Sequence, residues 1–345
     1  MRGGRWQRRA VLLVSVWLRA VTAAAGDDVP AIRIERFDYH GWPNSYRLSN
    51  GSIEAVVVTD VGPRIIELRL AGGENLLQPR EGIGQSGEST YRFRGGWRLW
   101  IAPERHETTY DLDNSPCRVE MIGNSGLRVI GPPQPRAGIQ KTIEIELFAD
   151  QPRLRLVSTI KNIGADTVEY APWSLPVLRA GGRAFVPFDV GDPNAFDATR
   201  SLILWSYTKI ADPRYRFGDR LIEIDHRKVQ APADDAAKRR SDESKIGVDS
   251  RQGWSAYLLD GTLFLKRFPP QPGRYPDGGS TIEVYSNHKF LELEHLGPLT
   301  LLKPGEEMTL PEEWWLFDGL VLPDGQAEAL PALDNILART GLAGH

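Results

Sequence analysis

The chain of 345 residues contains a single cysteine, Cys117. No intramolecular disulfide can form, so the fold must depend on its hydrophobic core alone. The segment around the thiol reads as a loop entering a strand, and no neighbouring base stands ready to activate it. A nucleophilic role for Cys117 is therefore not expected.

The sequence also lacks a surplus of one charge and lacks the common catalytic motifs. It has 42 lysines and arginines against 45 acidic residues, so no basic surface for nucleic acid is expected. No G-x-S-x-G, H-E-x-x-H, P-loop or C-x-x-C pattern occurs. We therefore expect no metal ion and no cofactor.

Long hydrophobic runs are missing, and the one apolar stretch lies at the N-terminus. Arginines precede the short run Ala10–Leu18, and small residues up to Ala25 follow it. This pattern predicts a signal peptide over residues 1–25, cleaved near Ala25, and a secreted or periplasmic protein without a membrane segment in its mature form. Arg8-Arg9 leaves twin-arginine export open beside the general route, and an uncleaved anchor is the alternative.

Helical periodicity is scarce after residue 30. Short alternating segments are separated by turns that draw on 25 prolines and 34 glycines, and residues 140–148 and 153–163 form a clear hairpin. This predicts an all-β sandwich domain over residues 30–325 and a helix with a tail over residues 326–345, the helix itself at Leu330–Thr340. The charged segment Arg227–Lys245 is expected to be a surface loop or a lid beside a cleft.

A late strand carries two acids on one face. With a period of two, Phe290, Glu292 and Glu294 share one face, while Leu291 and Leu293 point the other way. Buried sheet faces rarely hold two carboxylates unless the carboxylates are paired or used. The two glutamates therefore either line a pocket or form structural bridges with neighbouring cations.

A second candidate segment follows Gly95-Gly96. Alternation places Arg98 and Trp100 on one face. An indole can stack on the apolar face of a pyranose, and a guanidinium can donate paired hydrogen bonds to hydroxyls. The alternative is a core tryptophan beside a surface arginine.

These two segments, the turns at Gly297-Pro298 and Pro304-Gly305, and the strand ending in Trp314–Phe317 resemble the galactose mutarotase-like (aldose 1-epimerase-like) superfamily, and within it a branch of secreted bacterial domains. The resemblance spans residues 44–320. It implies a β-supersandwich with a concave binding face, a mono- or oligosaccharide as partner and no cofactor. It also implies that Glu294 is the general base, with Glu292 two residues before it.

The resemblance fails at the general acid. The epimerases carry an Asn-His pair on a middle strand, where this chain has Trp173 and Ser174, and neither donates a proton well at neutral pH. The candidate substitutes are His106, close to the arginine–tryptophan segment, His288 and His295. Further candidates for sugar binding are Trp173, Lys266, Tyr285 and Asn287. The polar and aromatic segments that contain Trp205, Tyr207 and Lys245 either line a cleft or pack as loops with solvated charge.

Three functions are compatible with these features. The first is a secreted carbohydrate-binding protein, and the second is an aldose 1-epimerase that uses Glu294 with a non-standard acid. The third is a structural module of the cell envelope. The two glutamates on one strand face favour the first two functions over the third, since buried carboxylates are costly unless they are paired or used. The sequence leaves the sugar and the oligomeric state open.

Overall fold

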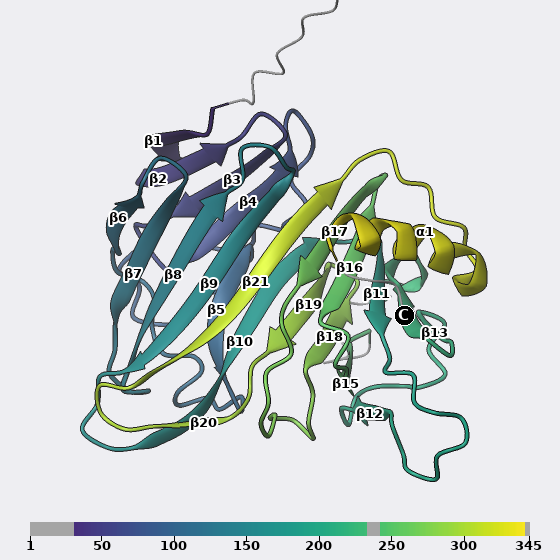
Figure 1. Ribbon diagram of the computed structural model, residues 1–345. Helices are drawn as coiled ribbons and strands as arrows, with labels where there is room; N and C mark the ends of the chain where they lie inside the picture. The colour runs from purple at the N-terminus through teal and green to yellow at the C-terminus, as the bar shows by residue number, and fades with distance from the viewer. Residues whose placement is uncertain (1–30, 233–241, 342–345) are drawn as a thin grey trace, which may run out of the picture.

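Two large antiparallel sheets stack face to face in the computed structural model, which describes residues 31–232 and 242–341 (Figure 1). The predicted signal peptide, residues 1–25, lies outside the described residues. The expectation of an all-β sandwich with a short C-terminal helix is confirmed.

The first sheet has eleven strands among the described residues, and strand β20 (Thr300–Leu302) pairs with β10 beside its main path. In sheet order that path runs β1 (Arg33–Tyr39), β2 (Trp42–Ser49), β3 (Ile53–Val58), β4 (Arg64–Leu70), β5 (Trp97–Ala102), β10 (Val168–Arg179), β19 (Phe290–Leu296), β18 (Ile282–Asn287), β15 (Ser244–Asp249) and β12 (Ser201–Leu204).

The second sheet has ten strands in the same part of the chain. Its order is β13 (Tyr215–Phe217), β14 (Leu221–Asp225), β11 (Arg183–Pro187), β16 (Trp254–Leu259), β17 (Thr262–Arg267), β21 (Glu307–Phe317), β9 (Arg153–Asn162), β8 (Ile139–Leu147), β7 (Gly126–Gln134) and β6 (Arg118–Ile122).

The main core lies between the two sheets and follows from strand alternation. In β8 every second side chain is buried, and β9 repeats the pattern in register with it, Ile143 opposite Ser158 and Ile145 opposite Leu156. These side chains pack against the inward faces of β3, β4 and β5. The predicted hairpin of residues 140–163 is thus confirmed.

Helix α1 (Gln326–Arg339) lies over the outer face of the second sheet (Figure 1). Its residues Leu333, Ile336 and Leu337 join an apolar cluster with side chains of β16, β17 and β21. The helix begins at Gln326, before the predicted start at Leu330, and Pro331 lies inside it. No helix in the described ranges is long and apolar enough to cross a membrane.

The charged segment needs a correction at its C-terminal end. Residues 233–241 lie outside the described residues, and His226–Lys228 forms one short 3-10 turn. Lys245, expected in a surface loop, is buried in strand β15. The reason is long-range, because β15 pairs with β18 and with β12 and so draws the lysine into the first sheet.

A polar network crosses the core between the sheets. The carboxylate of Glu312 on β21 accepts a hydrogen bond of 2.6 Å from Ser174 on β10, and it lies 3.1 Å from Nζ of Lys266 on β17. His295 Nδ1 on β19 lies 2.9 Å from the same carboxylate, and Ser255 of β16 bonds to Nε2 at 2.7 Å. Because an ionised carboxylate only accepts, Nδ1 carries the proton and Nε2 accepts from the serine.

The network fixes the charges of its members. Burial works to raise the pKa of Glu312, but Lys266, His295 and Ser174 together lower it to about 2. Burial, and then the charge of Lys266, lower the pKa of His295 to about 3. The interior therefore holds an ionised glutamate beside a neutral histidine.

The neutral state of His295 predicts a pH-dependent stability. In the unfolded chain His295 is protonated below the ordinary histidine pKa of about 6.5. In the folded chain it is protonated only below about pH 3. The free energy of unfolding therefore falls as the pH falls through this window, at up to about 1.4 kcal/mol per pH unit from this group. His295→Gln, which keeps a donor and an acceptor, is expected to flatten the dependence between about pH 7 and pH 5 in urea denaturation.

The matched control is His106→Gln, because His106 is exposed. Its pH dependence should follow that of the unmodified chain. Equal slopes for His295→Gln and the unmodified chain would contradict a neutral buried histidine.

Candidate functional site

A cavity of about 520 Å³ lies on the face of the first sheet that points away from the core. Phe290, Glu292 and Glu294 of β19 all line it, while Leu291 and Leu293 lie in the core between the sheets. The expected alternation of this strand is thus confirmed. Strands β5, β10, β15 and β18 contribute to the same cavity, and the segments before and after β5 cover one side of it.

The cavity is rich in aromatic side chains. Nine of its described lining residues are aromatic, namely Tyr91, Phe93, Trp100, Tyr110, Trp173, Trp205, Tyr207, Tyr285 and Phe290. The rings of Tyr91, Trp100 and Tyr110 meet at centroid distances of 4.9–5.8 Å. Several flat apolar faces therefore surround one space.

Most of the other lining side chains are charged. They comprise five carboxylates and two cations, namely Glu81, Glu104, Glu243, Glu292 and Glu294 with Arg98 and Lys245. The two cations are both buried, whereas Glu81 and Glu104 are exposed.

Arg98 and Glu292 form one buried pair. Nη1 of Arg98 donates to Oε1 of Glu292 at 2.8 Å, and the guanidinium carbon lies 3.9 Å from the ring centre of Trp100. Burial raises the pKa of Glu292 despite the charge of Arg98, with Glu294 adding to the rise. The arginine and the tryptophan thus face one space, as the alternation of β5 predicts.

Lys245 forms the second buried charge cluster. Its Nζ lies 3.0 Å from Oε2 of Glu294 and 2.6 Å from Oε2 of Glu283, which sits opposite Glu294 on β18. Burial works to lower the pKa of Lys245, but the two glutamates outweigh it and raise the value above its usual range. Burial also raises the pKa of Glu283 well above that of a free glutamate.

Two indoles flank the Lys245 ammonium. It lies 4.6 Å from the ring centre of Trp173 and 4.7 Å from that of Trp205, both within cation–π range. Gly247 permits this arrangement, since a Cβ at that position would come 3.3 Å from the ring of Trp205 and 2.2 Å from Oγ of Ser280. The glycine therefore lets the indole lie against strand β15.

Some polar atoms at the cavity have no partner among the described residues. Trp173 Nε1 donates to Oε2 of Glu294 at 2.8 Å, but Oε1 of the same glutamate is buried and accepts no hydrogen bond. Nε of Arg98 is likewise a buried donor without an acceptor. Because leaving such atoms unpaired costs free energy, they are candidates for hydrogen bonds with a molecule that enters the cavity.

The start of β5 depends on backbone that only glycine tolerates well. Gly95 and Gly96 have φ of 71° and 65°, and a Cβ at either would lie 2.0 and 2.4 Å from carbonyl oxygens of Gln78 and Ile65. This close approach sets the strand that carries Arg98 and Trp100.

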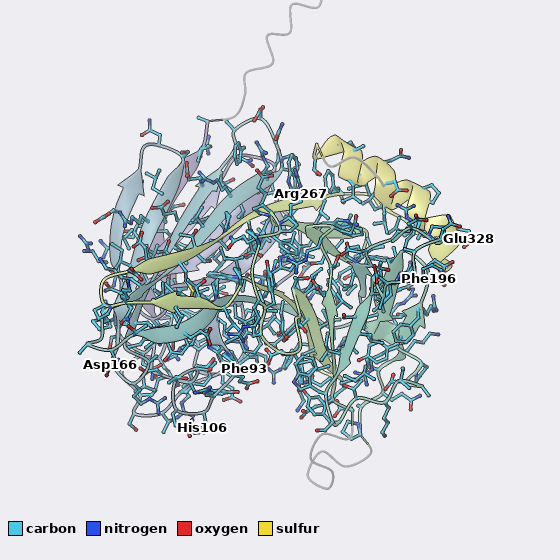
Figure 2. The ribbon with its side chains drawn as sticks, turned by 60° about the horizontal axis from the view of Figure 1, so that its bottom comes forward. Phe93, His106, Asp166, Phe196, Arg267 and Glu328 are labelled. Atoms are coloured by element: carbon cyan, nitrogen blue, oxygen red, sulfur yellow. The ribbon has the colours of Figure 1, made fainter. Side chains whose placement is uncertain are left out.

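The structure brings six of the principal sequence-predicted residues together in the cavity and leaves three outside it. Those inside are Glu292, Glu294, Arg98, Trp100, Trp173 and Tyr285. Those outside are His106, Lys266 and Asn287. His106 is exposed at the periphery, where it stacks on Tyr110 (Figure 2).

Lys266 and Asn287 lie elsewhere for physical reasons. Lys266 faces the core between the sheets, because it has the same parity on β17 as the core residue Phe264. Asn287 shapes the turn after β18, where its Oδ1 accepts from the backbone N–H groups of Lys289 and Phe290. Its amide also donates to the hydroxyl of Tyr285, which does line the cavity.

Sequence reasoning missed Tyr91 and Tyr110, which lie in segments without periodicity. It offered Trp205, Tyr207 and Lys245 as possible cleft residues, and all three line the cavity. The alternating Ile246 and Val248, which mark the start of a strand, are the signal that Lys245 is not part of a solvated loop. No group of three potential metal ligands occurs in the described part of the chain, and no lining residue suggests a particular cofactor.

The Lys245 cluster yields a stability prediction. Lys245→Met leaves Glu283 and Glu294 buried without their shared cation, which is expected to lower the free energy of unfolding by about 3–5 kcal/mol near neutral pH. Adding Glu283→Gln should restore part of the loss, because one uncompensated carboxylate is removed. Urea denaturation measures both, with Lys303→Met at an exposed lysine as control. A loss no larger than that of Lys303→Met would contradict the assigned pairing.

Comparison with solved structures shows the same fold in mutarotase-like proteins. A candidate aldose 1-epimerase from Klebsiella pneumoniae is 13% identical, with a TM-score of 0.55 over 89% of this chain and 87% of that one. A galactose mutarotase-like protein from Lactobacillus casei is 11% identical, with a TM-score of 0.52 over 79% of this chain and all of the other. No protein-family model and no curated protein matches the sequence. The chain has the galactose mutarotase-like fold, the β-supersandwich that its sequence resembles.

Proposed function

We propose that the chain is a carbohydrate-binding protein that holds a mono- or oligosaccharide in the cavity over β5, β10 and β19. The observation that carries the proposal is the lining itself, nine aromatic side chains around a few buried polar groups. Pyranose rings present apolar C–H faces and a rim of hydroxyls, which match aromatic faces and polar edges.

The unpaired atoms supply the polar half of this match. Oε1 of Glu294 can accept from a sugar hydroxyl, and Nε of Arg98 can donate to one. Trp173 and Lys245 hold the other oxygen of Glu294, so the carboxylate is oriented before a ligand arrives. Preorganisation of this kind reduces the entropy lost on binding.

The fold agrees with this choice, since its structural neighbours include a candidate aldose 1-epimerase. That likeness concerns the fold alone, so the sugar is proposed from the cavity. With the N-terminal signal predicted from the sequence, we place the proposed binding protein outside the cytoplasm, secreted or periplasmic.

A second candidate function, an aldose epimerase, is favoured by the two cavity glutamates. Glu294 Oε1 is free to take the proton of an anomeric hydroxyl, and the raised pKa of Glu292 suits a carboxyl that donates one. The anomeric O–H electrons would form the carbonyl while the bond from the anomeric carbon to the ring oxygen breaks, and that oxygen would take the proton from Glu292. Rotation and closure would return both protons and give the other anomer.

The binding proposal predicts loss of affinity when the stacking surface is removed. Trp100→Ala is expected to weaken binding of the best aldose in a panel by about tenfold or more, since a stacked aromatic contributes about 1–2 kcal/mol. Intrinsic tryptophan fluorescence or calorimetry measures the change.

Phe196→Ala is the matched control, because Phe196 is an exposed aromatic far from Phe93 and the cavity (Figure 2). It should bind as the unmodified protein does. A folded protein that binds no member of a broad sugar panel would refute the proposal.

The epimerase candidate predicts exchange between anomers. Saturation-exchange NMR on aldoses and uronic acids would show enzyme-dependent transfer between α and β signals, lost by about a hundredfold or more in Glu294→Gln because the base is gone. Glu307→Gln, at an exposed carboxylate that does not line the cavity, serves as the control. Exchange at the same rate as in buffer, with sugar binding intact, would reject the epimerase and leave the carbohydrate-binding function.

A further inference from the structure

The charges that the described residues bring to the cavity are unbalanced toward the acidic side. Five carboxylates but two cations line it among the described residues. Glu81 and Glu104 are exposed, while Glu292 and Glu294 are buried. Low-dielectric walls concentrate such a field inside a cleft, so a positive ligand is attracted and a negative one repelled.

Both cations of the lining are already committed to carboxylates. Lys245 lies between Glu283 and Glu294 at 2.6 and 3.0 Å, with an indole on either side. Arg98 donates to Glu292 at 2.8 Å and stacks on Trp100. A carboxylate or phosphate on a ligand would have to break one of these buried pairs, which is costly.

One buried atom of the cavity that lacks a partner among the described residues is an acceptor. Glu294 is fully buried, its side chain lines the cavity, and its Oε1 receives no hydrogen bond from the described residues. A donor on the ligand can satisfy this oxygen, whereas an anionic group, which only accepts, cannot. The unpaired donor, Nε of Arg98, can be met by a hydroxyl of the same sugar, so it requires no anionic group.

The aromatic lining adds a third attraction for positive charge. Tyr91, Trp100 and Tyr110 form one ring cluster, and the hydroxyl of Tyr110 donates to the carboxylate of Glu104. Aromatic faces that adjoin a carboxylate are the usual surroundings of a bound ammonium group.

We infer that the sugar recognised here is an amino sugar with a free ammonium group, preferred over neutral hexoses and over uronic acids or sugar phosphates. This inference rests on the proposed sugar site and narrows its ligand. The pyranose would stack on the indoles, and the ammonium would lie within the field of the lining carboxylates.

Calorimetric titration of the full chain with matched sugars tests the inference. The probes are galactose, galactosamine, N-acetylgalactosamine and galacturonic acid, with the corresponding glucose series, at about pH 6 so that the amine is protonated. We expect the amine to bind about tenfold tighter than the neutral sugar, the acetylated form to lose that gain, and the uronic acid to bind weakest. The gain should shrink as salt is raised, because exposed charges are screened.

The double variant Glu81→Gln/Glu104→Gln provides the charge-specific readout. It should reduce the ratio of amine to neutral affinity by about threefold, as expected when exposed charges several ångströms away are removed. Lys303→Gln, at an exposed lysine that does not line the cavity, should leave the ratio unchanged.

Each outcome decides a different question. Neutral or acidic sugars binding as tightly as the amine would overturn the inference while the proposed carbohydrate site stands. No binding by any sugar would refute the proposed function and the inference with it. Equal binding of ethanolamine would show an amine site that ignores the sugar, which also overturns the inference.

Discussion

The carboxylate of Glu312 is the point on which the two sheets and the cavity depend. It belongs to the second sheet, yet it is bonded to Ser174 on β10 and His295 on β19, the central strands of the first sheet. Lys266 pairs with it and also donates to the carbonyl of Leu293 on β19. Buried charges are tolerated only when geometry and partners are complete, so these contacts require β21 and β17 to lie at one position over β10 and β19.

The same contacts determine which side chains of β10 and β19 face the cavity. Trp173 precedes Ser174, and Glu294 precedes His295, so both network residues on the first sheet have a neighbour on the opposite face that lines the cavity. Because side chains alternate along a strand, fixing the position of one side chain in the core also fixes the position of its neighbour on the outer face. The Trp173–Glu294 hydrogen bond then repeats, on the outer face, the cross-strand link that the network makes inside.

The sequence was sufficient for features that depend on local alternation. The acid face of β19, the pairing of Arg98 with Trp100 on β5, and the β8–β9 hairpin all follow from a period of two. It was insufficient where long-range pairing decides. Lys245 looked like the end of a solvated charge run. Its position between Glu283 and Glu294 offsets the desolvation cost of burying its ammonium group. Lys266 looked like a cleft residue, but the parity of β17 turns it toward Glu312.

The environments of Glu292 and Glu294 differ although they share a strand and a face. Arg98 binds an oxygen of Glu292. Glu294 has Lys245 and Trp173 on one oxygen, and its other oxygen accepts no hydrogen bond from the described residues. A carboxylate with one oxygen held and one free is oriented for a ligand, whether that ligand gives up a proton or only shares one.

Binding and epimerisation therefore require the same geometry of Glu294, and they differ in the protonation state that they require of Glu292. A binding protein needs it as the counter-charge of Arg98, while an epimerase needs it to carry a proton. Burial of Glu292 favours the protonated form and Arg98 the ionised one, so the strength of this single ion pair is the physical quantity on which the two proposed functions differ.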